Sequence, residues 1–177
     1  MNTFVSIPFW SAEKCDAIVE RVGKTAGHEV LTTSYGKAPV VDKSVRQAHM
    51  YGMNDPSVND EILDLVLSRN EWGFELDGGL PSVEVLHYVE GGFQTAHTDW
   101  GGMHNKRKLS FSIQLSPPAS YEGGELILHD GPRPWMADMT QGSITLFPSW
   151  TLHSVQEVTA GERWSAVGWL LGGSSYV

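Results

Sequence analysis

The sequence predicts a mainly β domain, arranged as a sandwich or jelly roll, with flanking α-helices. Two amphipathic helical patterns occupy the first part of the chain, and from Pro81 onward the apolar residues recur with a period of two. Short strands of this kind, separated by turns rich in glycine, are typical of sandwiches and jelly rolls. The length of 177 residues fits one domain.

Both expected helices carry start signals. Ser11 can cap a helix that ends at about Gly23, and the Asp55-Pro56 pair provides an N-cap and a first-turn proline for a second helix ending at about Asn70. Their apolar faces comprise Cys15, Ile18, Val19 and Val22 in the first, and Ile62, Leu63, Val66 and Leu67 in the second. Residues 28–53 show no clear period and are interpreted as strand plus loop.

The strands follow from alternation. Residues 109–116 place Leu109, Phe111, Ile113 and Leu115 on one face and Ser110, Ser112, Gln114 and Ser116 on the other. This pattern predicts a half-buried strand. Further strands are expected at 82–89, 125–129, 143–147, 153–157 and 163–170, and pairs such as Ala160-Gly161 are interpreted as the turns between them.

Charge and composition argue against several classes of partner. The formal net charge is -9 and the pI is about 5.1, so neither a nucleic acid nor an anionic membrane is expected as a partner. No apolar run approaches the roughly 20 residues that span a bilayer. The first residues lack the pattern of a secretory signal, and Cys15 is the only cysteine. These features favour a cytoplasmic location.

Four residues suggest a chemistry. His97 and Asp99 are two positions apart, so on one strand both could reach the same metal ion, and His153 could complete the site from another strand. Two histidines and one carboxylate form the ligand set of non-haem Fe(II) oxygenases, which leaves open positions for a co-substrate and O₂. Arg163 follows ten residues later, and its guanidinium suits bidentate binding of a carboxylate.

An ordered set of motifs extends from Leu86 to Leu171. It comprises Tyr88-x-x-Gly91, His97-x-Asp99, the run 121–126 (YEGGEL), Gly142-Ser143, Phe147-Pro148, His153-x-Val155 and the run 161–164 (GERW). In order and spacing this half of the chain resembles the iron(II)/2-oxoglutarate-dependent dioxygenases, in their prolyl 4-hydroxylase-like branch.

The resemblance implies a double-stranded β-helix, which is a cupin-like jelly roll. We expect a single domain over residues 1–177, with helical support over about 1–80 and a catalytic core over about 81–172. The resemblance implies that His97, Asp99 and His153 bind Fe(II) and that Arg163 binds the distal carboxylate of 2-oxoglutarate, assisted by Tyr88. Ser165 shares a strand face with Arg163 and could add a hydroxyl. O₂ is the other co-substrate, and ascorbate is expected as a stimulant.

The resemblance also favours hydroxylation of a prolyl residue in a peptide or protein, with release of succinate and CO₂. A free amino acid or small metabolite, nucleobase demethylation and a non-catalytic jelly-roll binding protein are the alternatives. The segments expected to select the substrate are 28–53, with Tyr35 and Arg46, and 129–141, with Arg133 and Trp135. Whether residues 28–53 cover the site as a lid is left open, as is the oligomeric state.

Other residues carry a structural interpretation. Four of the histidines outside the set are expected at the surface or in packed positions: His49, His87, His104 and His129. His87 is expected to point away from the metal, because it alternates with Tyr88. The basic run 106–108 is interpreted as a solvated turn. Trp100 is assigned either to the substrate mouth or to packing, and Cys15 to the core.

Overall fold

Two antiparallel β-sheets face each other in the computed structural model, which describes residues 3–30, 40–53, 55–80 and 82–173. The larger sheet contains, in spatial order, β1 (Val5–Pro8), β11 (Ser143–Pro148), β7 (Arg107–Gln114), β13 (Val158–Leu171), β5 (Val83–Val89), β4 (His49–Met53) and β2 (His28–Glu29), and β8 (Tyr121–Gly123) pairs with β13. The smaller sheet contains β10 (Trp135–Met136), β9 (Leu126–Leu128), β12 (His153–Val155), β6 (Phe93–His97) and β3 (Arg46–Gln47). The predicted mainly β fold with flanking helices is confirmed.

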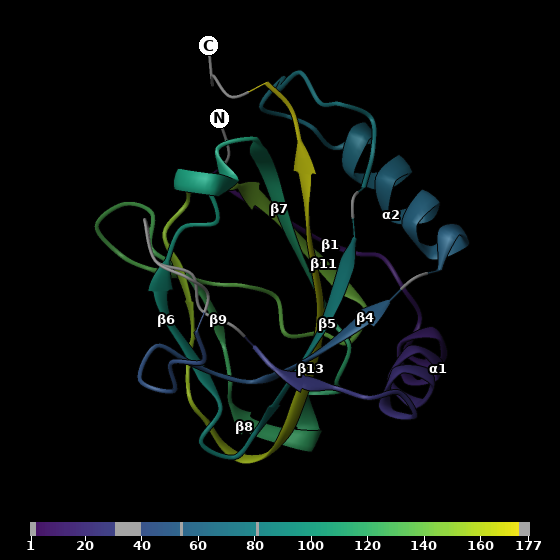
Figure 1. Cartoon of the computed structure of the whole chain (residues 1–177), viewed down its shortest axis with the longest axis vertical. Coiled ribbons are helices and arrows are strands. Elements are labelled where there is room, and N and C mark those ends of the chain that lie inside the picture. Colours follow the sequence, from purple (N-terminus) through teal and green to yellow (C-terminus); the bar gives the residue numbers. More distant parts are fainter. Residues whose placement is uncertain (1–2, 31–39, 54, 81, 174–177) are drawn as a thin grey trace.

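Two α-helices lie on one side of the larger sheet, and β6 and β9 of the smaller sheet lie on its other side (Figure 1). They are α1 (Ala12–Gly23) and α2 (Pro56–Ser68); single 3₁₀ turns cover Gly102–His104 and Pro118–Ser120. Both predicted N-caps are present. The Ser11 hydroxyl accepts a hydrogen bond from the backbone N–H of Lys14, and the Asp55 carboxylate accepts from those of Ser57 and Val58. No helix in the described part of the chain is long and apolar enough to cross a membrane.

The helices close the main hydrophobic core. Their buried faces pack against the apolar face of the larger sheet, and Cys15 lies in this core as expected. The main contributors are Ile18 and Val22 from α1, Ile62 and Val66 from α2, and Leu109, Phe111, Ile113 and Ile144 from the sheet. A second apolar cluster, which includes Leu86, Leu126, Leu128 and Val155, lies between the two sheets.

The central strand β7 differs from its prediction in one respect. Its polar residues Ser110, Ser112 and Gln114 are buried like its apolar ones, and so is Ser116 just beyond its end. The strand is therefore not half-exposed. Its polar face is turned toward the second sheet, so these side chains line the interior and form hydrogen bonds there. Gln114 Nε2, for example, donates to the Tyr121 hydroxyl at 2.8 Å.

Two further predictions are corrected. Leu67 was expected on the buried face of α2 but is exposed, because the core takes Val58, Ile62 and Val66 from this helix. The last strand begins at Val158 rather than Arg163, and the predicted turn at Ala160-Gly161 lies inside it. Gly161 has φ +72° and pairs with Tyr121 of β8, and the register of this pairing shifts between Val158 and Ala160.

The two faces of α2 provide a test of this packing. Ile62→Ala removes a fully buried side chain and should lower the free energy of unfolding by about 2–5 kcal/mol. Leu67→Ala, on the same helix but exposed, should lower it by less than about 1 kcal/mol. Urea unfolding of both variants measures the difference. Similar losses for the two variants would contradict the placement of α2.

Candidate active site

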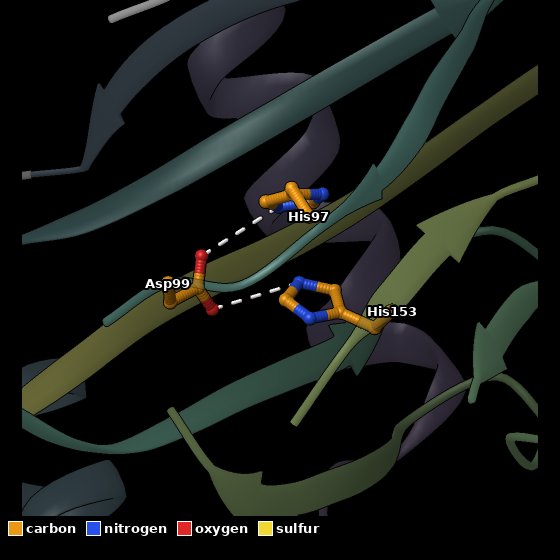
Figure 2. A group of neighbouring side chains, drawn as sticks. All are labelled: His97, Asp99 and His153. Atoms are coloured by element: carbon orange, nitrogen blue, oxygen red, sulfur yellow. Dashed lines mark ion pairs between the residues drawn. The ribbon is translucent and has the colours of Figure 1, made fainter. Parts of the chain in front are cut away.

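The antiparallel pairing of β6 with β12 brings the two predicted histidines together. His97 is the last residue of β6 and is paired directly with His153, the first residue of β12. Asp99 was expected on the same strand as His97 but lies just beyond its end. There its backbone N–H donates to the Ser149 carbonyl oxygen at 2.9 Å. Figure 2 shows the carboxylate facing both imidazoles.

The three side chains present their ligand atoms to one point. His97 Nε2 lies 3.6 Å from Asp99 Oδ1, and His153 Nε2 lies 3.6 Å from Asp99 Oδ2. One ligand atom from each residue falls within 4.8 Å of the others. His153 and Asp99 are buried, and His97 is partly exposed. The arrangement matches a three-ligand metal site with one face left for other ligands.

Backbone carbonyls fix the protonation pattern of both rings. Nδ1 of His97 lies 3.0 Å from the Thr95 oxygen, and Nδ1 of His153 lies 2.9 Å from the Thr151 oxygen. A carbonyl only accepts hydrogen bonds, so each Nδ1 carries a hydrogen and each neutral ring has its lone pair on Nε2. Burial lowers the pKa of His153, although the Asp99 charge opposes this effect. The neutral ring that metal binding requires is thus favoured.

The carboxylate of Asp99 is held in its charged form. Burial alone would raise its pKa, but the interactions with His153 and His97 and the Ser110 hydrogen bond outweigh burial and leave the pKa lowered. The Ser110 hydroxyl donates to Asp99 Oδ2 at 2.7 Å, and its oxygen lies 2.9 Å from the Ser149 hydroxyl. Sequence reasoning missed both serines. Only the alternation of β7 carried a signal, since it placed Ser110 on the polar face.

A cavity of about 410 Å³ extends from these three residues between the sheets. Tyr88, Arg163 and Ser165, the other predicted site residues, line it. Arg163 is paired with Tyr88 across β13 and β5, so the two side chains share a face. The guanidinium carbon lies 5.6 Å from the centre of the Tyr88 ring, and Nη1 donates to the Ser165 hydroxyl at 3.3 Å.

Arg163 is only 3% exposed, yet among the described residues no carboxylate oxygen lies within 4.0 Å of it. A buried cation without a counter-ion is unfavourable by several kcal/mol. Gly124 makes room for the side chain, because a Cβ at that position would lie 3.0 Å from Arg163 Cδ. The cavity therefore holds three side chains that could bind a metal ion and a cation for which the described residues supply no acidic partner. These features fit Fe(II) and a dicarboxylate such as 2-oxoglutarate.

Other residues are placed as follows. His87 stacks on Trp164 and contacts Glu162, away from the cavity as expected, and His129 bonds to Ser154. The expectation of a solvated turn at 106–108 is wrong: Lys108 is buried, and Arg107 lines the cavity. Trp100 is partly exposed and is not one of the lining residues.

Of the two segments expected to select the substrate, one supplies residues to the cavity lining, whereas the residues named in the other do not line it. Arg46 lines the cavity, as do His28, Val30 and Met50 from the same part of the chain. Arg133 and Trp135 are exposed and do not line it. Tyr35 lies outside the described residues. Sequence reasoning missed Glu84 and Trp169, both of which line the cavity.

Comparison with known proteins decides the family. The sequence model of the 2OG-Fe(II) oxygenase superfamily matches residues 83–171. The chain belongs to this superfamily. The name specifies Fe(II) and 2-oxoglutarate, in agreement with the resemblance found in the motifs. Residues 83–171 include the three candidate ligands, Tyr88, Arg163 and Ser165.

A PKHD-type hydroxylase of Parvibaculum lavamentivorans is 48% identical over 87 residues, which cover 49% of this chain and 40% of that protein. The chain thus spans less than half the length of this relative.

Two solved structures agree in fold. A prolyl-4-hydroxylase of Pseudomonas putida has a TM-score of 0.74 at 19% identity, over 97% of this chain and 94% of that one. A Trichoplax adhaerens prolyl hydroxylase was solved with a hypoxia-inducible-factor peptide fragment. It has a TM-score of 0.74 at 18% identity, over 97% of this chain and 84% of that one. The predicted double-stranded β-helix is confirmed.

The ligand assignment predicts the effect of three substitutions. His97→Ala, Asp99→Ala and His153→Ala each remove one of three ligands, so the affinity for Fe(II) should fall by more than about 100-fold. Anaerobic calorimetric titration measures this affinity. His129→Ala is the control. His129 lies just after β9, the strand that pairs with β12, and the variant should bind Fe(II) like the parent protein. Parental Fe(II) affinity in the Asp99→Ala protein would refute the assignment.

Ser110 should act on the metal through Asp99. Ser110→Ala removes the hydrogen bond to Asp99 Oδ2 and should weaken Fe(II) binding by about 10- to 100-fold. Ser112→Ala is the matched control, because Ser112 lies on the same face of β7, and no hydrogen bond from it to the three ligands is seen among the described residues. The same titration compares the two variants, and equal affinities would exclude a positioning role for Ser110.

Proposed function

We propose that this chain is an Fe(II)- and 2-oxoglutarate-dependent dioxygenase that hydroxylates a C–H bond and releases succinate and CO₂. The observation that carries the proposal is the buried Arg163, without an acidic partner among the described residues, in the cavity that also contains His97, Asp99 and His153. A dicarboxylate that reaches from the metal to Arg163 would neutralise this cation. We further propose that residues 1–177 act as one catalytic domain.

The side chains have distinct roles in this proposal. His97, Asp99 and His153 would hold Fe(II), and Arg163, with Ser165 and Tyr88, would bind the distal carboxylate of 2-oxoglutarate. The bound metal, co-substrate and O₂ supply the oxidising chemistry when present. The protein supplies orientation: two carbonyls fix the imidazole tautomers, and Ser110 fixes the carboxylate. Asp99 and His153 are also buried.

For the substrate we propose a prolyl residue in a peptide or protein. Two supports are the names of relatives: the Pseudomonas putida structure is a prolyl-4-hydroxylase, and the Trichoplax adhaerens enzyme was solved with a peptide. The mixed apolar and polar lining of the cavity, which includes Leu86, Val167 and Trp169, is compatible with a pyrrolidine ring.

Mass spectrometry tests the activity directly. Purified protein with Fe(II), 2-oxoglutarate and O₂ is incubated with a library of proline-containing peptides and free amino acids. We expect a product 16 Da heavier, together with one equivalent of succinate, and neither product should form without Fe(II). Succinate formation without any modified compound would retain the oxygenase activity and reject the prolyl substrate. Absence of both products would reject the proposed function.

Arg163 provides a quantitative prediction. Loss of one partner from a buried, hydrogen-bonded charge pair typically costs about 2–5 kcal/mol, which corresponds to roughly 30-fold to several-thousand-fold in affinity. Arg163→Ala should therefore raise the KM for 2-oxoglutarate at least tenfold, while Fe(II) affinity changes little. Arg163→Lys should be intermediate, because it keeps the charge but loses the bidentate geometry.

Steady-state kinetics with varied 2-oxoglutarate measures these effects. Arg69→Ala is the control, since Arg69 is exposed at the end of α2 and does not line the cavity. An unchanged KM in Arg163→Ala would mean that another residue binds the co-substrate.

A further inference from the structure

Gln94 lies beside the candidate metal ligands and has no role in the proposed function as stated so far. It belongs to β6, three residues before His97, and both side chains line the cavity. Its Nε2 lies 2.9 Å from His97 Nε2, the nitrogen that would bind the metal. Among the described residues, His97 is the only hydrogen-bond partner of this side-chain amide. One candidate ligand atom therefore already has a partner within the protein.

The register between β6 and β12 brings Gln94 and His97 to the same face. In a regular strand, residues three positions apart point to opposite faces. Here His97 is paired with His153 and Gln94 with Val155, so three steps along β6 match two steps along β12. The additional residue in β6 restores a common direction for the two side chains. Sequence spacing alone predicts the opposite, so sequence reasoning did not find this contact.

The chemistry of the two groups sets the direction of their hydrogen bond. His97 Nδ1 carries the hydrogen that is donated to the Thr95 carbonyl, so Nε2 of the neutral ring offers only a lone pair. The Gln94 N–H is therefore the donor. One lone pair cannot accept this hydrogen and bind a metal ion at the same time. The amide and the metal ion thus compete for His97 Nε2.

Metal binding would leave the Gln94 amide without its acceptor. A metal ion cannot accept a hydrogen bond, but an oxygen ligand on the ion can. In the proposed function one carboxylate of 2-oxoglutarate binds Arg163 and the other end reaches the metal, within the cavity that Gln94 also lines. A carboxylate is a strong acceptor for an N–H group, because its charge shortens and strengthens the hydrogen bond. The co-substrate could therefore supply the acceptor that the metal removes.

We propose that Gln94 binds the co-substrate in a metal-dependent way. Its amide competes with the metal ion for His97 Nε2 and, once displaced, donates a hydrogen bond to the carboxylate of 2-oxoglutarate nearest to the metal. Gln94 thus weakens the binding of the metal alone and strengthens the binding of 2-oxoglutarate to the metal-loaded protein. This inference rests on the proposed function, because it concerns the same metal and co-substrate.

Gln94→Met tests the proposal, because it removes the amide and keeps an unbranched side chain. Anaerobic calorimetry measures the affinity for Fe(II), and then the affinity for 2-oxoglutarate with and without saturating Fe(II). We expect Fe(II) to bind the variant about 2- to 12-fold more tightly than the parent protein, which corresponds to one net hydrogen bond. 2-Oxoglutarate should bind at least about fivefold more weakly to the Fe(II)-loaded variant. Without Fe(II), its affinity should change little.

The opposite signs of these changes separate the proposal from a structural role, since a damaged site would bind both ligands more weakly. Gln156→Met is the control. Gln156 is exposed just after β12 and does not line the cavity, so this variant should match the parent protein in both affinities. An Fe(II) affinity that stays equal or falls in Gln94→Met would overturn the proposal. Equal or tighter binding of 2-oxoglutarate to the Fe(II)-loaded variant would overturn it as well.

Nuclear magnetic resonance tests the displacement in the unaltered protein. The side-chain amide signal of Gln94 is identified as the one missing from Gln94→Met. It is followed while Zn(II), which has no redox chemistry, is added, and then during addition of 2-oxoglutarate. We expect the signal to shift with the first equivalent of Zn(II) and to shift again with 2-oxoglutarate. A signal that Zn(II) leaves unchanged would overturn the proposal.

Succinate formation with Fe(II), measured on the same preparation, separates this inference from the proposed function. Succinate together with unchanged affinities in Gln94→Met would retain the proposed function and reject the role of Gln94. Opposite changes of the two affinities without succinate or a modified compound would retain the role of Gln94 in binding and reject the proposed function.

Discussion

The pairing of β6 with β12 is the interaction on which the candidate site depends. It places His153 directly opposite His97, and the segment that follows β6 carries Asp99 to the same point. The Asp99 loop is fixed in turn by Ser149, whose carbonyl accepts its N–H, and by Ser110 from the facing sheet. A shift of one residue in this register would turn one imidazole to the opposite face and leave only two ligands. The candidate metal site therefore depends on the strand register as well as on the identity of the three residues.

The interior between the sheets holds the polar candidate site beside an apolar cluster, and the outer core contains the main hydrophobic packing. Arg163, Asp99 and His153 are buried together with serines on β7, and burying such groups is unfavourable unless they form hydrogen bonds. The apolar residues of α1, α2 and the outer face of the larger sheet form the main core on the other side. This division leaves the cavity free for ligands while the two helices hold the sheet that carries Arg163.

Local signals in the sequence were sufficient for some of these features. Ser11 and Asp55-Pro56 predicted two helix starts, and the spacing of His97, Asp99, His153 and Arg163 predicted a set of side chains that the structure brings into one cavity. Other features depend on the second sheet. The serines of β7, Lys108 and Arg107 were assigned to solvent because alternation cannot distinguish a water-exposed face from a polar interior. Glu84 gave no signal, since only the packing of the two sheets brings it into the same cavity as Arg46.

The central claim is that one cavity binds Fe(II) and 2-oxoglutarate together, and their energetic coupling tests it most directly. Anaerobic calorimetry can titrate 2-oxoglutarate into the protein with and without bound Fe(II). We predict one equivalent of each ligand and an affinity for 2-oxoglutarate that rises at least about tenfold when Fe(II) is present, because the co-substrate would then contact both the metal and Arg163. Reciprocity requires the same increase in Fe(II) affinity when 2-oxoglutarate is bound first. Independent binding of the two, or no binding of 2-oxoglutarate with Fe(II) present, would contradict the account.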